Sequence, residues 1–185
     1  MTTETTLDRR SLLLAAATML AERLDPLGLT EEELAQAVGL SLDEFSREFD
    51  GVEAYLSAAQ LQFFEGRLSS VIARAGSMHP GFDRIRTAWT GYLDYSVQHA
   101  GLFSWLRRAR QRFPALHEEV RRRNHGVLLM IQMEFSALKC PHPMESARLA
   151  VGMVLETVKL ETEARARNDA MRAQLWAALE VLART

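Results

Sequence analysis

The sequence predicts an all-helical (all-α) protein of about nine helices, in which a small N-terminal head precedes a larger helical body. Three observations support this fold class. Ala, Leu, Arg and Glu, which are good helix formers, dominate the 185 residues. Only five prolines and ten glycines interrupt the chain, and apolar residues recur at helical spacing between them. With 48% apolar residues, the chain can bury one sizeable core, or a small head plus a body.

The first expected helix covers about residues 9–24, where the apolar residues fall on one helical face. An arginine pair followed by an apolar run is also typical of a secretory signal. Acidic residues lie before and directly after this run, however, and they argue against a signal. The run is also too short to span a bilayer. We therefore expect a helix of the head and no membrane segment.

Two short helices follow, and a predicted capping box opens each of them. Thr30 precedes Glu33 by three residues, and Ser41 precedes Glu44 in the same way. Each hydroxyl and each carboxylate can then bind an unpaired backbone N–H group at the start of its helix. Gly39 ends the first of the two helices and permits a tight turn. Two short helices joined by a glycine turn predict a helix-turn-helix.

The body is expected to hold six further helices, separated by breaks that contain Gly or Pro. They cover about residues 52–75, 82–99, 103–109, 114–138, 144–164 and 167–183. The last two are expected to form an antiparallel hairpin. We therefore place the head in residues 1–51 and the body in residues 52–185.

The head resembles the DNA-binding head of the TetR (tetracycline-repressor-like) family. The resemblance rests on the stretch from Leu29 to Ser41, followed by Phe45, Phe49 and the segment 53–56. It implies a ligand-responsive transcriptional regulator of the repressor type, which binds DNA as a homodimer in the cytoplasm. The body would then bind the ligand and dimerise. The DNA-binding positions implied by the resemblance are Arg9, Arg10, Thr30, Ser41, Leu42, Asp43, Ser46 and Arg47.

The recognition helix departs from the family pattern. Asp43 and Glu48 stand where the family has Gly and His, and Ser46 stands where it has Tyr. Val52 replaces a Lys that usually meets a phosphate. Between positions 30 and 60, one arginine stands against eight acids, whereas DNA affinity comes largely from cations that neutralise phosphates. The alternative function is therefore a small-molecule-binding or protein-modulating protein of the same fold that has lost direct DNA binding.

The body carries aromatic and Met side chains on the helices that enclose the effector pocket in this family, which favours an apolar or aromatic effector. The alternative is an ordinary core. The implied ligand-binding residues are Phe63, Trp89, Tyr92, Phe103, Leu106, Val127, Met130, Ile131 and Glu134. The terminal hairpin is expected to pair with its copy, to pack within one chain, or both. The implied dimerisation residues are Val151, Val154, Leu155, Val158, Leu175 and Leu179.

Two arginine clusters, at residues 107–112 and 121–123, admit three interpretations. They can form a solvated face that pairs with Glu118 and Glu119. They can receive the anionic head of a ligand, or they can dock the acidic head of the same or another molecule.

The sequence gives little support to an enzyme. It contains no glycine-rich phosphate loop, no nucleophile elbow and no pair of histidines at metal-binding spacing. We expect neither a cofactor nor a metal. The single cysteine, Cys140, cannot form an internal disulfide, which suits a reducing compartment.

Overall fold

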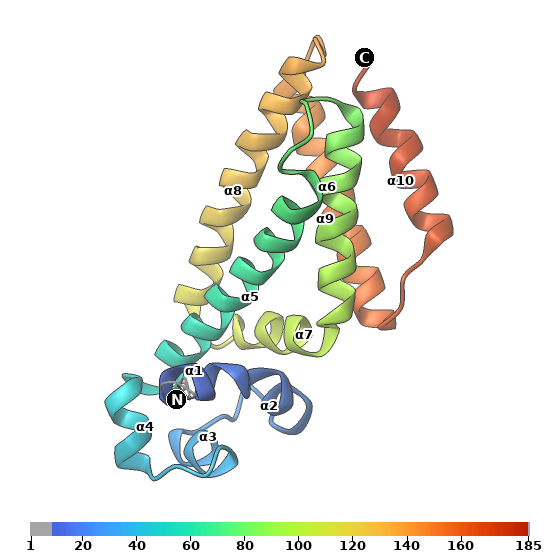
Figure 1. Cartoon of the computed structure of the whole chain (residues 1–185). Helices are drawn as coiled ribbons and strands as arrows, with labels where there is room; N and C mark the ends of the chain where they lie inside the picture. The colour runs from blue at the N-terminus through green and yellow to red at the C-terminus, as the bar shows by residue number, and fades with distance from the viewer. Residues whose placement is uncertain (1–8, 185) are drawn as a thin grey trace, which may run out of the picture. The chain divides into compact units, whose positions relative to one another are not determined.

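The computed structural model describes residues 9–184, in which helices are joined by turns and loops and no strand occurs (Figure 1). The all-α prediction is confirmed. The described chain divides into two compact units. The first unit contains residues 9–63 and 101–117, and the second contains residues 64–100 and 118–184. None of the helices in the described range is long and apolar enough to cross a membrane.

Ten helices are assigned within residues 9–184, one more than expected. The expected first helix is divided into α1 (Arg9–Ala15) and α2 (Ala17–Arg23). The intervening Ala16 has ψ −14°, well away from the helical value near −42°. The break is slight, because the Ala16 N–H still donates to the Leu12 carbonyl at 3.1 Å.

The first unit is built around α3 (Glu31–Ala37) and α4 (Leu42–Glu48), which form the helix-turn-helix. The first part of α5 (Gly51–Ala75) packs on them. Phe45, Phe49 and Tyr55 form an aromatic core, with ring centroids 5.8 Å apart for the two phenylalanines. The Tyr55 hydroxyl is buried and donates to the Leu13 carbonyl at 3.0 Å. This bond ties α5 to α1.

The first unit also contains most of α7 (Ala100–Ala109), whose side chains hold the loop between α2 and α3. The Trp105 indole N–H donates to the Leu24 carbonyl at 2.8 Å. Just after the helix, Arg112 donates to the carbonyls of Leu27 and Leu29, at 2.9 and 3.2 Å. The arginine cluster at 107–112 therefore includes a residue that stabilises the loop through backbone carbonyls.

The second unit contains the rest of α5, α6 (Phe82–Gln98), most of α8 (Pro114–Ala137), α9 (Pro143–Ala164) and α10 (Asp169–Leu182). Helix α9 contacts both α6 and α10 (Figure 1). Helices α9 and α10 run antiparallel, as expected for the terminal hairpin (Figure 1).

An ion-pair network around the buried Arg172 joins four helices of the second unit. Arg172 on α10 is only 2% exposed and donates two hydrogen bonds to Glu161 on α9, at 2.8 and 2.7 Å. Its third bond reaches Asp94 on α6 at 2.5 Å. Arg74 on α5 also binds Asp94, at 2.7 Å. Burial alone raises the pKa of Asp94, but the hydrogen bonds from the two arginines outweigh it and hold the pKa below its usual value of 3.8.

Candidate functional site

The helix-turn-helix is fixed by local hydrogen bonds, and both predicted capping boxes are present. The Thr30 hydroxyl accepts from the Glu33 N–H at 3.2 Å, and the Glu33 carboxylate accepts from the Thr30 N–H at 3.0 Å. Ser41 and Glu44 form the second box in the same way. Gly39 has φ +75°, a left-handed conformation that favours glycine, so it makes the turn between the two helices.

The six implied DNA-binding positions of the helix-turn-helix are all exposed; they are Thr30, Ser41, Leu42, Asp43, Ser46 and Arg47. Three of these side chains already have a structural role within the chain. Thr30 and Ser41 act as caps, and the Ser46 hydroxyl donates to the Leu42 carbonyl at 3.0 Å. Among these six positions, the two charged side chains are Asp43 and Arg47, one of each sign.

The two N-terminal arginines are directed toward α4. Arg9 forms an ion pair with Glu44 at 3.2 Å. Arg10 donates to the Glu48 carbonyl at 2.6 Å and lies 4.3 Å from the centroid of the Phe49 ring. Hydrogen bonds from Ser41 are the largest cause of the lowered pKa of Glu44, and Arg9 adds to them. Part of the acidic charge of α4 is thus balanced from within the chain.

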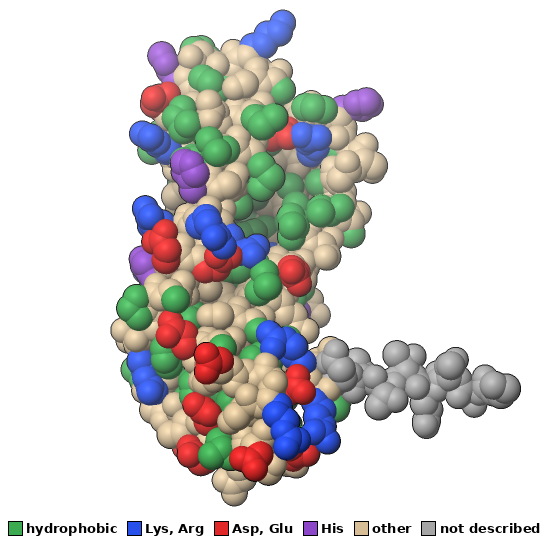
Figure 2. All heavy atoms as spheres, turned by 90° about the vertical axis from the view of Figure 1, so that its left-hand side faces the viewer, with side chains coloured by type: hydrophobic (Ala, Val, Ile, Leu, Met, Phe, Trp, Pro, Cys, Tyr) green, Lys and Arg blue, Asp and Glu red, His purple; other side chains and the backbone are tan. Residues whose placement is uncertain are grey.

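Acidic side chains nevertheless recur across the face shown in Figure 2. They lie over the lower part of this view, which is the helix-turn-helix unit, and basic side chains gather at one edge of that unit (Figure 2). A polyanion that approaches this face would meet acidic side chains over much of it and basic side chains mainly toward one edge (Figure 2). The predicted departure from a basic DNA-binding surface therefore persists in three dimensions.

Three implied ligand-binding residues, Trp89, Tyr92 and Val127, meet at one hollow in the second unit. Its volume is about 20 Å³, enough for about one water molecule. Helices α6, α8 and α9 supply the walls. The lining residues are Trp89, Tyr92, Asn124, Val127, Val151, Val154 and Leu155.

The other implied ligand-binding residues lie elsewhere. Phe63, Phe103 and Leu106 belong to the first unit, where the rings of the two phenylalanines pack 5.9 Å apart and Leu106 is fully buried. On α8, Ile131 is buried, whereas Met130 is 54% exposed. Glu134, also on α8, forms an ion pair with Arg84 on α6.

Sequence reasoning missed a buried arginine beside the hollow. Arg67 on α5 is 8% exposed, and its guanidinium carbon lies 4.2 Å from the centroid of the Tyr92 ring. A signal for this burial exists in the sequence. Arg67 follows Phe63 by four residues and precedes Val71 by four, so it falls on the apolar stripe of its helix.

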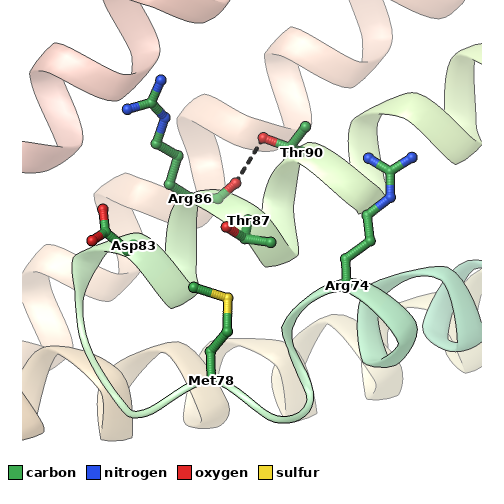
Figure 3. Close-up of a pocket in the computed structure, with 6 residues that line it drawn as sticks. All are labelled: Arg74, Met78, Asp83, Arg86, Thr87 and Thr90. Carbon is green, nitrogen blue, oxygen red and sulfur yellow. Dashed lines mark hydrogen bonds between the residues drawn. The ribbon is translucent and has the colours of Figure 1, made fainter.

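A larger groove lies between the end of α5 and α6 (Figure 3). Its volume is about 610 Å³, and Arg74 and Arg86 stand on either side of Thr87 and Thr90 (Figure 3). Met78 and Asp83 complete its lining. The groove is open and polar, and Arg74 is already paired with Asp94. Effector sites are mostly apolar and enclosed, with volumes of roughly 300–1,000 Å³. The small hollow has such a lining without the volume, and the groove has the volume without such a lining.

The implied dimerisation residues divide into two groups. Val154, Val158, Leu175 and Leu179 are at most 5% exposed within a single chain, so they pack inside the second unit. Leu155 is 37% exposed, and Val151 is partly exposed. Other apolar side chains of the hairpin that reach the surface are Leu149, Leu160 and Val181, at 59%, 44% and 61% exposure.

The cluster at 121–123 pairs locally, as its simplest interpretation expects. Arg121 binds Glu118 at 2.8 Å, and Arg122 and Arg123 both bind Glu119. Within residues 9–184, no three His, Cys, Asp or Glu side chains gather into a group that could hold a metal ion.

The sequence matches no family model. No curated protein is similar to it either. Solved structures, in contrast, resemble it over nearly its whole length. A protein from Rhodococcus sp., proposed to be a TetR-family transcriptional regulator, has a TM-score of 0.79 at 19% identity, and the match covers 95% of this chain and 98% of that one.

Two further structures are similar. A proposed transcriptional regulator from Pseudomonas aeruginosa PAO1 has a TM-score of 0.78 at 12% identity, with 96% of this chain and 93% of that one covered. The fatty acid degradation regulator FadR from Bacillus halodurans has a TM-score of 0.68 at 11% identity, with 97% and 96% covered. The resemblance expected from the head is therefore confirmed at the level of the fold, and this chain has the fold of TetR-family transcriptional regulators.

Proposed function

We propose that this protein is a ligand-responsive transcriptional regulator of the repressor type that binds DNA as a homodimer. The observation that carries the proposal is the helix-turn-helix within a fold of this kind. Helix α4 is capped and follows a glycine turn, and it exposes Leu42, Asp43, Ser46 and Arg47. Two such helices in a dimer would enter successive major grooves about 34–36 Å apart.

The charge of the head sets the expected strength and salt dependence of DNA binding. Each phosphate that a cation neutralises adds about 0.9 to the slope of log K against log salt. Arg9 and Arg10 already contact α4, so their phosphate contacts compete with bonds inside the chain. We therefore expect a slope below that of regulators with six to ten phosphate contacts, which is about 5 to 9.

The test is binding to the DNA upstream of the protein's own coding sequence, measured by fluorescence anisotropy from about 50 to 200 mM salt. We expect a Kd of about 10 nM or below at low salt, and weaker binding to unrelated DNA. Arg47→Gln should lower the slope by about 1. The double variant Asp43→Asn, Glu48→Gln should bind unrelated DNA more tightly because it removes two repulsive charges.

The matched control is Glu145→Gln, which removes an exposed acid from α9 and should leave DNA binding unchanged. Weak binding that varies little with salt and does not prefer the upstream DNA would refute the proposal. The alternative would then remain, namely a small-molecule-binding or protein-modulating protein of this fold. The mass of the protein in solution, from light scattering, tests the homodimer.

Effector binding at the hollow would work through helix displacement. An effector larger than a water molecule cannot enter about 20 Å³ unless the surrounding side chains move. Tyr92 lines the hollow and also packs against Arg67 on α5. Helix α5 continues back to Gly51, directly after the helix-turn-helix. A shift of α5 is therefore the proposed route from effector to head.

A further inference from the structure

Asp43 carries an exposed carboxylate on the face of α4 that the proposed function directs toward DNA. No residue in the range 9–184 forms a hydrogen bond or an ion pair with this carboxylate. It is therefore available to accept a hydrogen bond from a ligand. An acid at this place also repels phosphates, so its presence on a DNA-binding helix calls for a physical explanation.

The other two acids of α4 have different surroundings. Glu44 belongs to the second capping box and forms an ion pair with Arg9 at 3.2 Å. Glu48 lies about 140° from Asp43 around the helix axis, because each residue turns an α-helix by about 100°. Arg10 donates to the backbone carbonyl of Glu48 on that side. Glu44 and Glu48 are both partly buried, so Asp43 is the exposed acid of α4.

The exposed face of α4 places a cation beside this acid. Arg47 follows Asp43 by four residues, which puts the two side chains about 40° apart around the helix axis. Both are exposed. The Ser46 hydroxyl between them is turned back to the Leu42 carbonyl. Arg47 can therefore bind a phosphate and offset part of the repulsion, while Asp43 meets the edge of a base.

Cytosine is the base whose major-groove edge suits a carboxylate. An ionised carboxylate only accepts hydrogen bonds. Guanine presents two acceptors in the major groove, N7 and O6, and thymine presents the acceptor O4 and a methyl group. Adenine presents the acceptor N7 beside its amino group, whereas cytosine presents its N4 amino group as a donor and no acceptor of its own. A carboxylate is therefore attracted by cytosine and repelled by guanine and thymine.

We propose that Asp43 selects cytosine in each half-site of the bound DNA, by accepting a hydrogen bond from the N4 amino group in the major groove. This inference rests on the proposed DNA binding by α4. Residues near the start of a recognition helix contact base edges in helix-turn-helix proteins, and Asp43 is the second residue of α4. The acid then weakens binding to most sequences and restores it where cytosine stands, so it contributes specificity more than affinity.

A purely structural role for Asp43 predicts a different outcome on substitution. An acid in the first turn stabilises a helix through the helix dipole, and Asp43 stands two residues after the cap Ser41. Asp83 stands two residues after the cap Gly81 of α6 and is also exposed. Asp83→Ala is therefore the matched control, with the same chemical change at the same helix position. If Asp43 acts only on its helix, Asp43→Ala changes stability as the control does and keeps the base preference of the wild type.

The experiment begins with selection of the preferred sequence from a random DNA library by the full-length protein. The affinity for each of the four base pairs at each position is then measured by fluorescence anisotropy at one salt concentration. We expect one position in each half-site at which cytosine is preferred by about 5- to 150-fold. N4-methylcytosine still pairs with guanine but lacks the major-groove donor, so at this position it should bind the wild type more weakly than cytosine does.

Asp43→Ala should lose the preference for cytosine at this position and bind cytosine and N4-methylcytosine equally. Its binding to unrelated DNA should be retained or become tighter, which shows that the variant is folded. Asp43→Asn should shift the preference toward adenine, because an amide both donates and accepts and so matches the amino group and N7 of that base. Asp83→Ala should keep the preference of the wild type.

The outcomes distinguish this inference from the proposed DNA binding. A wild-type protein that selects no DNA sequence overturns both. A protein that selects a sequence without such a cytosine, or whose preference for cytosine survives in Asp43→Ala or Asp43→Asn, overturns this inference and leaves the regulator function in place. Equal tightening of Asp43→Ala on all four base pairs would reveal repulsion alone and would also overturn it.

Discussion

Substitution of Arg172 tests the buried network that joins α6, α9 and α10. Arg172→Ala removes three charge-assisted hydrogen bonds, two to Glu161 and one to Asp94. Glu161 is 1% exposed and would keep the hydrogen bond from the Asn168 backbone N–H at 2.8 Å. Leaving a buried charge without its partner costs about 3–5 kcal/mol. For a chain of this size, about 2–4 °C per kcal/mol gives a fall in Tm of about 6–20 °C.

The assay is thermal unfolding followed by circular dichroism at a fixed pH near neutrality. Arg184→Ala on the same helix is the matched control, because its ion pair with Glu180 is exposed and should contribute less than about 1 kcal/mol. The double variant Arg172→Met, Glu161→Leu should recover much of the loss, since it removes the buried charges from both α9 and α10. A fall for Arg172→Ala no larger than that of the control would refute this reasoning.

Two further predictions concern pH and helix capping. Because the pKa of Asp94 is lowered in the folded protein, its contribution to stability is full above the unfolded value near 3.8 and is lost as pH falls through the lower, folded value. In urea titrations, Asp94→Asn should therefore be less stable than the wild type at neutral pH, and the difference should shrink below about pH 4; a constant difference would contradict the assignment. Ser41→Ala should cost about 1 kcal/mol through loss of the α4 cap. Ser46→Ala, whose hydroxyl bonds only within the helix, should change stability by less than about 0.5 kcal/mol, and equal effects of the two variants would argue against the cap.

Local chemistry explains why the head could be predicted from the sequence. The capping boxes at Thr30 and Ser41 depend on partners three residues away, so the sequence itself contains both halves of each interaction. The break at Ala16 could not be foreseen, because alanine favours a continuous helix and no turn residue marks the position.

The body was harder to predict, because helical spacing identifies an apolar face but not what covers it. Helix α8 is apolar on almost every side between residues 127 and 135, yet Met130 and Met133 are exposed and Phe135 is buried. Arg67 illustrates the opposite case. Its place on an apolar stripe was a signal for burial, but a charged residue is usually assigned to solvent, and the rings of Phe64 and Tyr92 that pack on it come from the structure.

The length of α5 has a mechanical consequence. Its 25 residues form a rod about 37 Å long, at 1.5 Å per residue. A rigid rod works as a lever, so a tilt of only about 5° would move one end by about 3 Å relative to the other. Gly51 and Arg67 stand on this one unbroken helix. Proline introduced near the middle of the rod would kink or break it, because it removes a backbone hydrogen bond of the helix.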